Sequence, residues 1–228
     1  FDATSFTGDG ISNWDTSNVT TLRLTFRGAN LFTGDGLIDW DTSRVTDMRA
    51  TFRYATSFTG DDLSNWDTSR LTNMLRTFQG ATEFTGDSLS NWNTSSVTTL
   101  RETFYDATSF NGNILNWDIL NVNNFEDTFD GTTTLNNCTK RSIYNSWNSQ
   151  RSGVMDSDYS SWASLSCTCA ANEYVSSHIC VACAAGTTND AGDDTSGPDT
   201  TCDITFCAVN QYVSNNACVA CTAGTTND

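Results

Sequence analysis

The 228-residue sequence has one histidine and one proline, and all nine of its cysteines lie at or after Cys138. The histidine, His178, stands in a polar segment without the serine, cysteine and aspartate spacing of a nucleophilic triad. No glycine-rich phosphate-binding loop occurs either. We therefore expect no catalytic centre, and we predict that the protein is not an enzyme and has no cofactor.

Basic residues are also scarce, since 11 Lys and Arg oppose 27 Asp and Glu for a net charge of −16. No Lys or Arg follows Arg151, although nine acidic residues do. An acidic chain repels phosphate groups, so we expect no nucleic-acid partner and no direct membrane insertion of this segment. A solvated extracellular surface is the simplest interpretation of the charge.

What the sequence does contain is a repeat, marked by five tryptophans: Trp14, Trp40, Trp66, Trp92 and Trp117. Their spacings of 26, 26, 26 and 25 indicate one structural unit copied in tandem. Phenylalanine, aliphatic and threonine positions recur with the same period. One repeat has too little apolar surface to fold alone, so stacking is expected to join these positions into a continuous interior.

The predicted fold is mainly β with short helical turns, arranged as a leucine-rich-repeat-like parallel solenoid over residues 1–132. Segments such as Val19–Leu22 and Val45–Met48 are rich in β-branched residues and are predicted to be strands. The stretch from Arg23 to Ala29 is predicted to form one helical or 3₁₀ turn. Arg23, Arg49, Arg76 and Arg101 are expected to form surface ion pairs with acidic positions on the same face.

The repeated pattern Phe-Thr-Gly-Asp-x-Leu-Ser-Asn-Trp-Asp-Thr-Ser-x-Val-Thr-x-Met/Leu, followed by Thr-Phe-x-Gly-Ala, resembles the BspA-like leucine-rich-repeat surface proteins. The resemblance covers residues 1–132 and implies an exposed adhesive or structural role. One departure is threonine before the second phenylalanine, where the family often has methionine. It leaves the expected fold intact but places a polar column beside the core.

Residues 133–166 differ from the repeat and are predicted to cap its last turn. Ile143, Tyr144 and Trp147 have near-helical spacing, and a short helix is expected from Thr139 to Asn148 with Asn136 or Asn137 near its start. A partner-binding helix is the alternative interpretation.

Residues 167–228 form a cysteine-rich region with a second repeat, in which Cys169, Cys180 and Cys183 recur 38 residues later as Cys207, Cys218 and Cys221. Small cysteine-dense modules are held by disulfides and need an oxidising compartment. The region resembles cysteine-rich repeats of ciliate surface antigens, and more loosely tumour-necrosis-factor-receptor-like modules. That resemblance implies the pairs Cys169–Cys180, Cys183–Cys202 and Cys207–Cys218, with Cys138 paired to Cys167 and Cys221 left over.

Several polar positions have two interpretations. Asn18, Asn93 and Asn137 begin Asn-x-Ser/Thr sequons and are candidate N-glycosylation sites. Stacked acidic columns and the loop from Asp190 to Asp199 could hold Ca²⁺, but we favour turn-forming aspartates and a solvated loop. The two Cys-x-x-Cys pairs could form a zinc or redox centre, or structural disulfides, which we favour. The acidic columns are Asp9, Asp35, Asp61, Asp87, Asp15, Asp41, Asp67 and Asp118.

Both ends of the sequence fall inside a repeat, with Phe1 aligned to Arg27 and Asp228 in mid-module. We therefore expect a segment of a longer protein, in which a missing signal peptide or anchor is uninformative.

These patterns predict an extracellular or cell-surface structural glycoprotein that self-associates into fibrils or a surface layer. The alternative is an adhesin that binds protein or glycan on one face of the repeats, which exposed Trp and Tyr would favour and buried Trp would disfavour. A third interpretation is ice binding through a regular threonine array, formed by Thr16, Thr42, Thr68 and Thr94.

Overall fold

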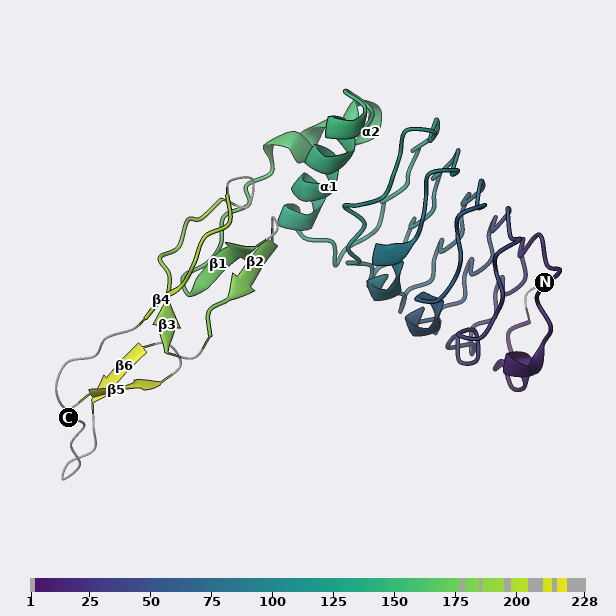
Figure 1. Cartoon of the computed structure of the whole chain (residues 1–228), viewed down its shortest axis with the longest axis horizontal. Helices are drawn as coiled ribbons and strands as arrows, with labels where there is room; N and C mark the ends of the chain where they lie inside the picture. The colour runs from purple at the N-terminus through teal and green to yellow at the C-terminus, as the bar shows by residue number, and fades with distance from the viewer. Residues whose placement is uncertain are drawn as a thin grey trace. The chain divides into compact units, whose positions relative to one another are not determined.

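The structure is a computed structural model that describes residues 3–176, 179–184, 186–194, 198–204, 211–214 and 217–220. The chain divides into two compact units, Phe1–Ala163 and Ser164–Asp228. The first unit holds the repeats and two α-helices, and the second holds six short β-strands (Figure 1).

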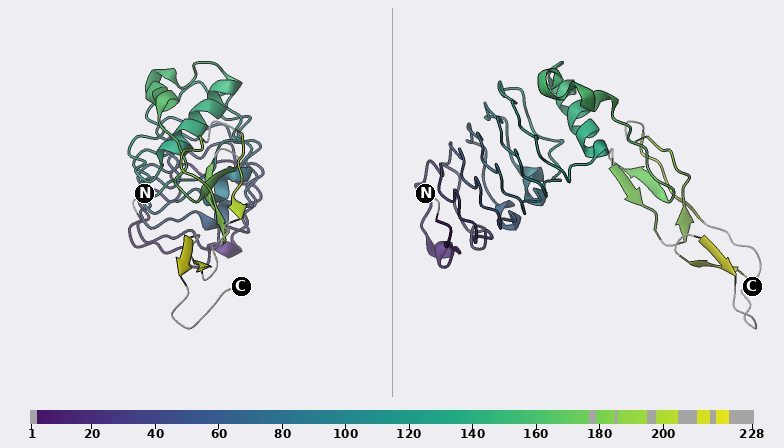
Figure 2. Two further views of the ribbon diagram at one scale, coloured as in Figure 1. Left: turned by 90° about the vertical axis from the view of Figure 1, so that its left-hand side faces the viewer. Right: turned by 180° about the vertical axis from the view of Figure 1, so that it is seen from behind.

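Successive repeats lie against one another as stacked coils, which Figure 2 shows from two further directions. One residue in each repeat forms a parallel bridge to the next repeat, in the series Thr21, Asp47, Asn73, Thr99 and Asn124. The backbone N–H groups that follow donate onward, as Leu22 does to the Asp47 carbonyl at 2.9 Å and Phe26 to the Thr51 carbonyl at 2.9 Å. Each repeat thus provides the hydrogen-bond partners of its neighbour.

The prediction of a mainly β, leucine-rich-repeat-like parallel solenoid is wrong. Among the described residues, β-strands occur only as three antiparallel two-stranded sheets, all of them after residue 172. The segments 19–22 and 45–48, predicted as strands, contribute one isolated bridge residue each. The stretch from Arg23 to Ala29, predicted as a helical turn, consists of non-helical turns.

The backbone after each bridge explains why no strand forms there. The Asp47 side chain accepts a hydrogen bond from the Arg49 N–H at 2.9 Å, and Asn73 accepts one from Leu75 at 3.0 Å. This local turn leads into a residue in the left-handed region, where a strand cannot continue. The left-handed residues, with φ between 51° and 62°, are Leu24, Ala50, Arg76, Glu102 and Asp127.

The interior of the stack is aromatic. The second phenylalanine ring of one repeat stacks closely on the first of the next, as in Phe52 and Phe58 with centroids 3.9 Å apart. The Trp40 and Trp66 rings are parallel to within 3° and largely buried, and the Trp66 indole N–H donates to the carbonyl of Leu37 in the preceding repeat at 3.0 Å. Burying such rings with their N–H groups bonded supplies much of the stabilisation of the stack.

The threonine column beside this core is fully buried and hydrogen-bonded from Thr51 onward. The Thr77 hydroxyl lies 2.8 Å from the Met74 carbonyl and 3.1 Å from that of Met48 in the preceding repeat. Thr51 and Thr103 repeat the arrangement. Because the hydroxyl satisfies carbonyls of two repeats, it joins them without leaving a buried polar group unmatched.

Short 3₁₀ helices form at one corner of three repeats: η1 (Ile11–Asn13), η2 (Asp61–Leu63) and η3 (Asp87–Asn91). Each follows a glycine with φ near +85°. At Gly60 a side chain would also collide with the ring of Phe84 in the next repeat. Glycine is therefore required there for two reasons, a left-handed backbone and a close ring.

Helix α1 (Asn137–Gln150) covers the last repeat and contains the predicted segment Thr139–Asn148. Asn136 caps it by accepting the Thr139 N–H at 2.9 Å. Its buried Trp147 ring stacks on Trp117 at 6.5 Å. Gln150 accepts from the Ile119 N–H at 3.0 Å and donates to the Trp117 carbonyl at 2.8 Å. Helix α1 thus continues both the aromatic column and the backbone hydrogen bonding of the repeats.

After α1 come helix α2 (Asp156–Tyr159) and the 3₁₀ helix η4 (Ser160–Ser164). Tyr159 and Trp162 pack against Phe129, with ring centroids 5.6 and 5.3 Å away. The Tyr159 hydroxyl accepts the Phe129 N–H at 2.9 Å. These residues bury the last phenylalanine of the repeat series.

The second unit contains antiparallel pairs of short strands. Strand β1 (Glu173–Ser176) pairs with β2 (Ile179–Ala182), β3 (Thr187–Thr188) with β4 (Asp203–Ile204), and β5 (Gln211–Ser214) with β6 (Ala217–Ala220). Disulfides join Cys169 to Cys180 and Cys183 to Cys202. None of the described helices combines the length and apolarity needed to cross a membrane.

Candidate functional site

The most highly charged surface of the first unit is one edge of the repeat stack. It is formed by five aligned segments, which we call the charged edge: residues 23–28, 49–54, 75–80, 101–106 and 126–131. Six of the eight arginines before residue 132 lie in these segments. Their side chains leave the core because the neighbouring threonine and phenylalanine point inward.

Glu102 is the centre of an ion-pair network on this edge. Arg76 donates two hydrogen bonds to its carboxylate, at 2.9 and 2.8 Å, and Gln79 donates a third at 3.0 Å. Arg101 lies 3.1 Å from Glu102 and 3.2 Å from Glu126. Glu102 is only 7% exposed, and the Arg76 guanidinium holds the pKa of its carboxyl below the ordinary value.

A second surface is a shallow hollow of about 710 Å³ on another side of the repeats. It is lined by hydroxyl groups and two guanidinium groups, from Thr20, Arg44, Thr46, Ser69, Arg70, Thr72 and Ser96. The threonine hydroxyls donate to backbone carbonyls of the preceding repeat. The Thr46 hydroxyl donates to the Thr20 carbonyl at 3.3 Å, and the Thr72 hydroxyl donates to the Thr46 carbonyl at 2.9 Å. Their lone pairs remain available to accept hydrogen bonds from a ligand.

The two arginines of this hollow differ in their partners. Arg44 donates to the Asn18 side chain at 3.0 Å. Arg70 is exposed, and within the described part of the chain its guanidinium makes no hydrogen bond. Arg44 and Arg70 occupy the same position of two successive repeats, and both line this hollow.

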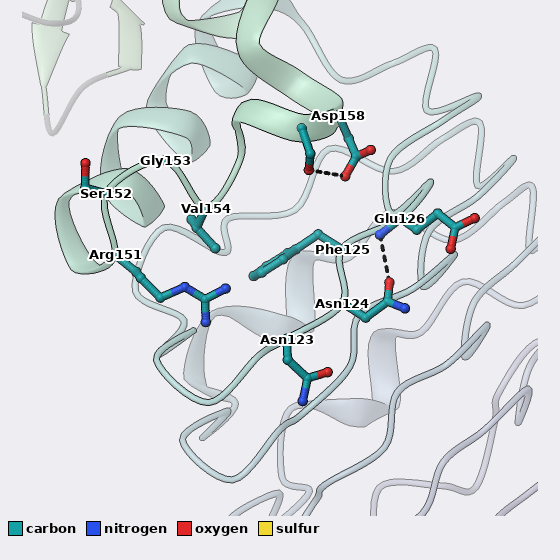
Figure 3. A pocket seen from close by; sticks show the side chains of 10 residues that line it. Asn123, Asn124, Phe125, Glu126, Arg151, Ser152, Gly153, Val154 and Asp158 are labelled. Carbon is teal, nitrogen blue, oxygen red and sulfur yellow. Dashed lines mark hydrogen bonds between the residues drawn. The ribbon is translucent and has the colours of Figure 1, made fainter.

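A pocket of about 380 Å³ lies where the residues after α1 meet the last repeat (Figure 3). Arg151 donates to the Val122 carbonyl at 2.6 Å and lies over the Phe125 ring at 5.8 Å. Asp158 accepts from Ser157, and the Asn124 side chain accepts the Glu126 N–H. Arg151 thus joins the residues after α1 to the last repeat, whereas the hydrogen bonds of Asp158 and Asn124 are local.

A third hollow, of about 400 Å³, lies beside Tyr159 and Trp162. The Tyr159 hydroxyl donates to Asp130 at 3.3 Å. Burial of the ring raises the pKa of this phenol, so it remains protonated at neutral pH. The Lys140 ammonium lies 5.9 Å from the centre of the Trp162 ring. This hollow also belongs to the packing of α2 and η4.

The acidic columns act as turn-forming groups. Asp15, Asp41 and Asp67 each accept the backbone N–H of the serine two residues later, at 3.0, 3.0 and 2.9 Å. Hydrogen bonds from that serine, chiefly from its hydroxyl, lower the pKa of each carboxyl. Asp9, Asp35, Asp61 and Asp87 each accept from a threonine hydroxyl two residues earlier. These bonds supply a structural role for the aspartates that does not need Ca²⁺.

All three sequon asparagines lie on the surface. Asn18 accepts the bond from Arg44, while Asn93 forms a turn by accepting from the backbone and hydroxyl of Ser95. Asn137 is the first residue of α1. Glycosylation at these positions stays a prediction.

The predicted cysteine site is brought together in part. Cys169 and Cys180 are joined, as are Cys183 and Cys202, so Cys180-x-x-Cys183 contributes to two different disulfides. Cys138, Cys167 and Cys218 are also oxidised. The pairs Cys138–Cys167 and Cys207–Cys218 stay predictions, and Cys207, Cys221 and His178 lie outside the described residues. Among the described residues, the single metal-like cluster is Cys169, Glu173 and Cys180, whose two sulfur atoms are already bonded to each other.

Two surface interpretations depended on exposed side chains. Trp40, Trp66, Trp92 and Trp117 are at most 5% exposed, whereas Trp14 is 55% exposed. The threonine array proposed for ice binding is buried, since Thr16, Thr42, Thr68 and Thr94 are at most 6% exposed. A flat threonine surface is therefore absent at these positions.

Sequence reasoning missed the buried carboxylate of Glu102 and the hollow at Arg44 and Arg70. Arg76 is aligned with the left-handed residues Ala50 and Glu102, whereas Arg23, Arg49 and Arg101 share the preceding position of the repeat. Glu102 lies one 26-residue period after Arg76, so the repeat period alone could have predicted that the two side chains are neighbours.

A family described as "Mycoplasma protein of unknown function, DUF285" matches residues 1–88 and again residues 61–169. The match supports the resemblance of the repeats to BspA-like surface proteins, whereas the resemblance of the cysteine-rich region to ciliate antigens stays a prediction. No curated protein and no solved structure gives a significant match.

Proposed function

The chain belongs to the DUF285 family, and we propose that it is an extracellular structural protein of a cell surface that self-associates into fibrils or a layer. A surface association follows from the family resemblance, and the disulfides fit an oxidising, extracellular environment. Self-association is the further step that the following observations support.

The observation that carries the proposal is the burial of the aromatic columns. Aromatic rings that could otherwise bind a ligand stack between repeats. The Phe78 and Phe104 ring centroids, for example, lie 5.8 Å apart with planes inclined by 2°. Side-chain and backbone hydrogen bonds follow the same period. Such a body is stiff and presents a regular surface, which suits assembly better than enclosure of a small substrate.

The three hollows described above support a role other than catalysis. The hollow at Arg44 contains guanidinium and hydroxyl groups that are not paired as nucleophile and base. The polar groups at Arg151 and Tyr159 are engaged in helix packing. We therefore propose that the protein is not an enzyme.

Electron microscopy and sedimentation of non-reduced protein test the proposal. Regular filaments or layers, with a sedimentation coefficient that rises with protein concentration, are the expected result. Intact mass before and after deglycosylation tests the sequons separately. Monomers at every concentration, both before and after deglycosylation, would overturn self-association.

The hollow at Arg44 and Arg70 favours a second candidate function, adhesion through an acidic glycan. The guanidinium pair would bind a carboxylate or sulfate, and the threonine lone pairs would accept hydrogen bonds from sugar hydroxyls. Binding of an acidic oligosaccharide should weaken about tenfold in Arg70→Gln, in line with loss of a charge-assisted contact. Arg49→Gln, which removes the same charge from the charged edge, is the matched control. Equal affinity for the neutral form of the sugar would argue against this function.

A further inference from the structure

Tyr54 occupies a position of the repeat that holds glycine in three other repeats. The aligned residues are Gly28, Gly80, Asp106 and Gly131, and all five have φ between 55° and 78°. This left-handed conformation suits glycine and disfavours a bulky side chain. Tyr54 is nevertheless 43% exposed. An aromatic ring that the backbone disfavours and the core does not bury points to a role on the surface.

The ring of Tyr54 is held in place by its neighbours. A side chain at Gly80 in the next repeat would collide with it, so the glycine makes room for the ring. The Arg53 guanidinium lies 4.6 Å from the ring centre and donates to the Tyr54 hydroxyl at 3.0 Å. An aromatic surface and a cation are therefore fixed side by side.

Two arginine charges near this ring have no acidic partner. Within the described residues, no carboxylate lies within ion-pair distance of Arg49 or Arg53. Asp47 contributes one negative charge nearby, and its carboxylate accepts the Arg49 backbone N–H. Exposed Arg23, one period before Arg49, adds a positive charge that offsets it. We call Arg49, Arg53 and Tyr54 the Tyr54 patch, a basic surface with an exposed aromatic ring.

The second unit, Ser164–Asp228, has the opposite charge. Its sequence contains seven Asp and Glu and no Lys or Arg, so all eleven basic residues belong to the first unit. Acidic side chains of the repeats are mixed with arginines and hold turns, as Asp41 and Asp67 do near Arg44 and Arg70. The second unit is therefore the part of the chain whose charge has one sign throughout.

The strand pair β3 and β4 presents both acidic and apolar side chains (Figure 1). Asp203 pairs with Thr188 in antiparallel register, and Asp190 follows Thr188 by two residues. Both aspartates are exposed, and Ile204 beside Asp203 is 67% exposed. Cys202, which forms a disulfide, immediately precedes Asp203 and fixes the start of β4. Carboxylates next to an exposed apolar side chain complement a surface of guanidinium groups next to a ring.

We propose that the Tyr54 patch of one copy binds the β3–β4 strand pair of a second copy. Arg49 and Arg53 pair with Asp190 and Asp203, and the Tyr54 ring covers Ile204. This contact rests on the self-association proposed above and identifies one interface of that assembly. Because it joins two different surfaces, a pair of copies keeps one free surface of each kind and can add further copies. Repetition of the contact gives a filament rather than a closed twofold pair.

Charge reversal of either surface tests the contact. The patch variant is Arg49→Glu with Arg53→Asp, and segment 126–131 already has an acid at each of the two aligned positions. The strand variant is Asp190→Lys with Asp203→Lys, at two exposed positions. Both variants should therefore fold, which circular dichroism checks.

Sedimentation of the full-length, non-reduced protein should show that each variant needs at least about tenfold more protein than wild type to assemble. A chain that carries all four substitutions should assemble at the wild-type concentration, because both surfaces are reversed together. Raising the salt from about 0.05 to 0.5 M should weaken assembly of the wild type. Arg44→Glu with Arg70→Glu makes the same change in net charge as the patch variant on another surface, and it should leave assembly unchanged.

Tyr54→Gly separates a role in the contact from a role in folding. Glycine suits the left-handed backbone that the aligned Gly28 and Gly80 adopt, so the Tm should stay constant or rise. Assembly should nevertheless weaken about tenfold, because the ring no longer covers Ile204. A fall in Tm without weaker assembly would assign the ring to folding and contradict the contact.

The outcomes separate this contact from the proposed function. If wild type assembles and neither charge variant changes the concentration that assembly needs, the contact is wrong and self-association stands. If each variant fails to assemble and the combined chain fails as well, the two surfaces do not face each other and the contact is again wrong. If wild type remains monomeric at all concentrations, both proposals fail.

Discussion

Trp147 of α1 stacks on Trp117 of the repeats, with ring centroids 6.5 Å apart and planes inclined by 12°. The geometry is close to that of Trp66 on Trp92, at 6.4 Å and 8°. A helical residue thus takes the place that a repeat tryptophan has in the column. Trp147 is also fully buried, and its indole N–H donates to the Ile114 carbonyl at 3.4 Å.

Trp147→Ala should destabilise the first unit by about 3–5 kcal/mol, the usual range for removing a buried tryptophan. The loss has two causes, because the cavity opens against Trp117 and the Ile114 carbonyl loses one of its two donors, keeping the Trp117 N–H. Chemical denaturation followed by circular dichroism measures it. Trp14→Ala is the matched control, because Trp14 stacks on Trp40 but is 55% exposed. Equal losses in the two variants would contradict a special role for Trp147.

Gly60→Ala should cost more stability than Gly10→Ala. Both glycines have φ near +85°, so both substitutions carry the penalty of a left-handed backbone, about 1 kcal/mol. A methyl group at Gly60 would in addition collide with the Phe84 ring, whereas nothing lies within 4 Å of the same position at Gly10. Thermal unfolding should therefore show a larger fall in Tm for Gly60→Ala. Equal falls in Tm would show that the Phe84 ring can move aside without cost.

Glu102→Gln should destabilise the repeats by about 1–3 kcal/mol at neutral pH, as expected for loss of charge-assisted hydrogen bonds. Because the pKa of Glu102 is lowered on folding, its ionised form contributes stability above its ordinary value of 4.5. That contribution is lost as the pH falls below 4.5 and through the lowered folded pKa. The difference in free energy of unfolding between wild type and Glu102→Gln, measured by urea titration, should therefore shrink over this pH range. A difference that stays constant down to about pH 2 would contradict the ion pair as its source.

The periodic core of this protein could be predicted from its sequence. Tryptophan and phenylalanine spacing identified the residues that face inward, because a stacked interior requires the same residue type at the same phase in every repeat. The helix from Asn137 to Gln150 was predicted within a few residues, since Ile143 and Trp147 have helical spacing and Asn136 caps the helix. Both features depend on local pattern.

The backbone conformation could not be predicted in the same way. Val45 to Met48 has the composition of a strand, but the Asp47 side chain captures the Arg49 N–H and Ala50 adopts φ 53°. The β-propensity of a residue reflects how its side chain packs in a sheet, and it does not predict a turn of this kind. A left-handed alanine has no recognisable sequence signal, because glycine or asparagine would be expected there.

Loss of the Cys183–Cys202 disulfide should destabilise the second unit by about 3 kcal/mol, the value expected for a loop of similar size. Cys183→Ala with Cys202→Ala should increase amide hydrogen exchange in the paired strands β3 and β4, which the bond holds close. Exchange of the bridge residues Asp47 and Asn73 in the first unit should not change. An equal rise in both units would contradict their independence.

Asp127→Asn should stabilise the isolated chain by about 0.5 kcal/mol, the opposite of the usual effect of a substitution. Asn adopts the left-handed conformation that residue 127 has, at φ 52°, and it removes a carboxylate that burial and its neighbours Asp130 and Glu126 disfavour. Because folding raises the pKa of Asp127, the ionised carboxylate costs stability above that raised pKa. The electrostatic part of the benefit should therefore disappear as the pH falls to the ordinary value of 3.8, whereas the part due to the left-handed backbone should remain.

Asp67→Asn is the matched control, since Asn93 already stands at the aligned position in the next repeat. The pKa of Asp67 is lowered, chiefly by the Ser69 hydroxyl, so its carboxylate favours folding above 3.8 and loses that effect as the pH falls through the folded pKa. The two variants should thus differ in sign at neutral pH, which urea unfolding measures. An Asp127→Asn variant that is less stable than wild type would contradict the conclusion that burial and the neighbouring acids disfavour this carboxylate.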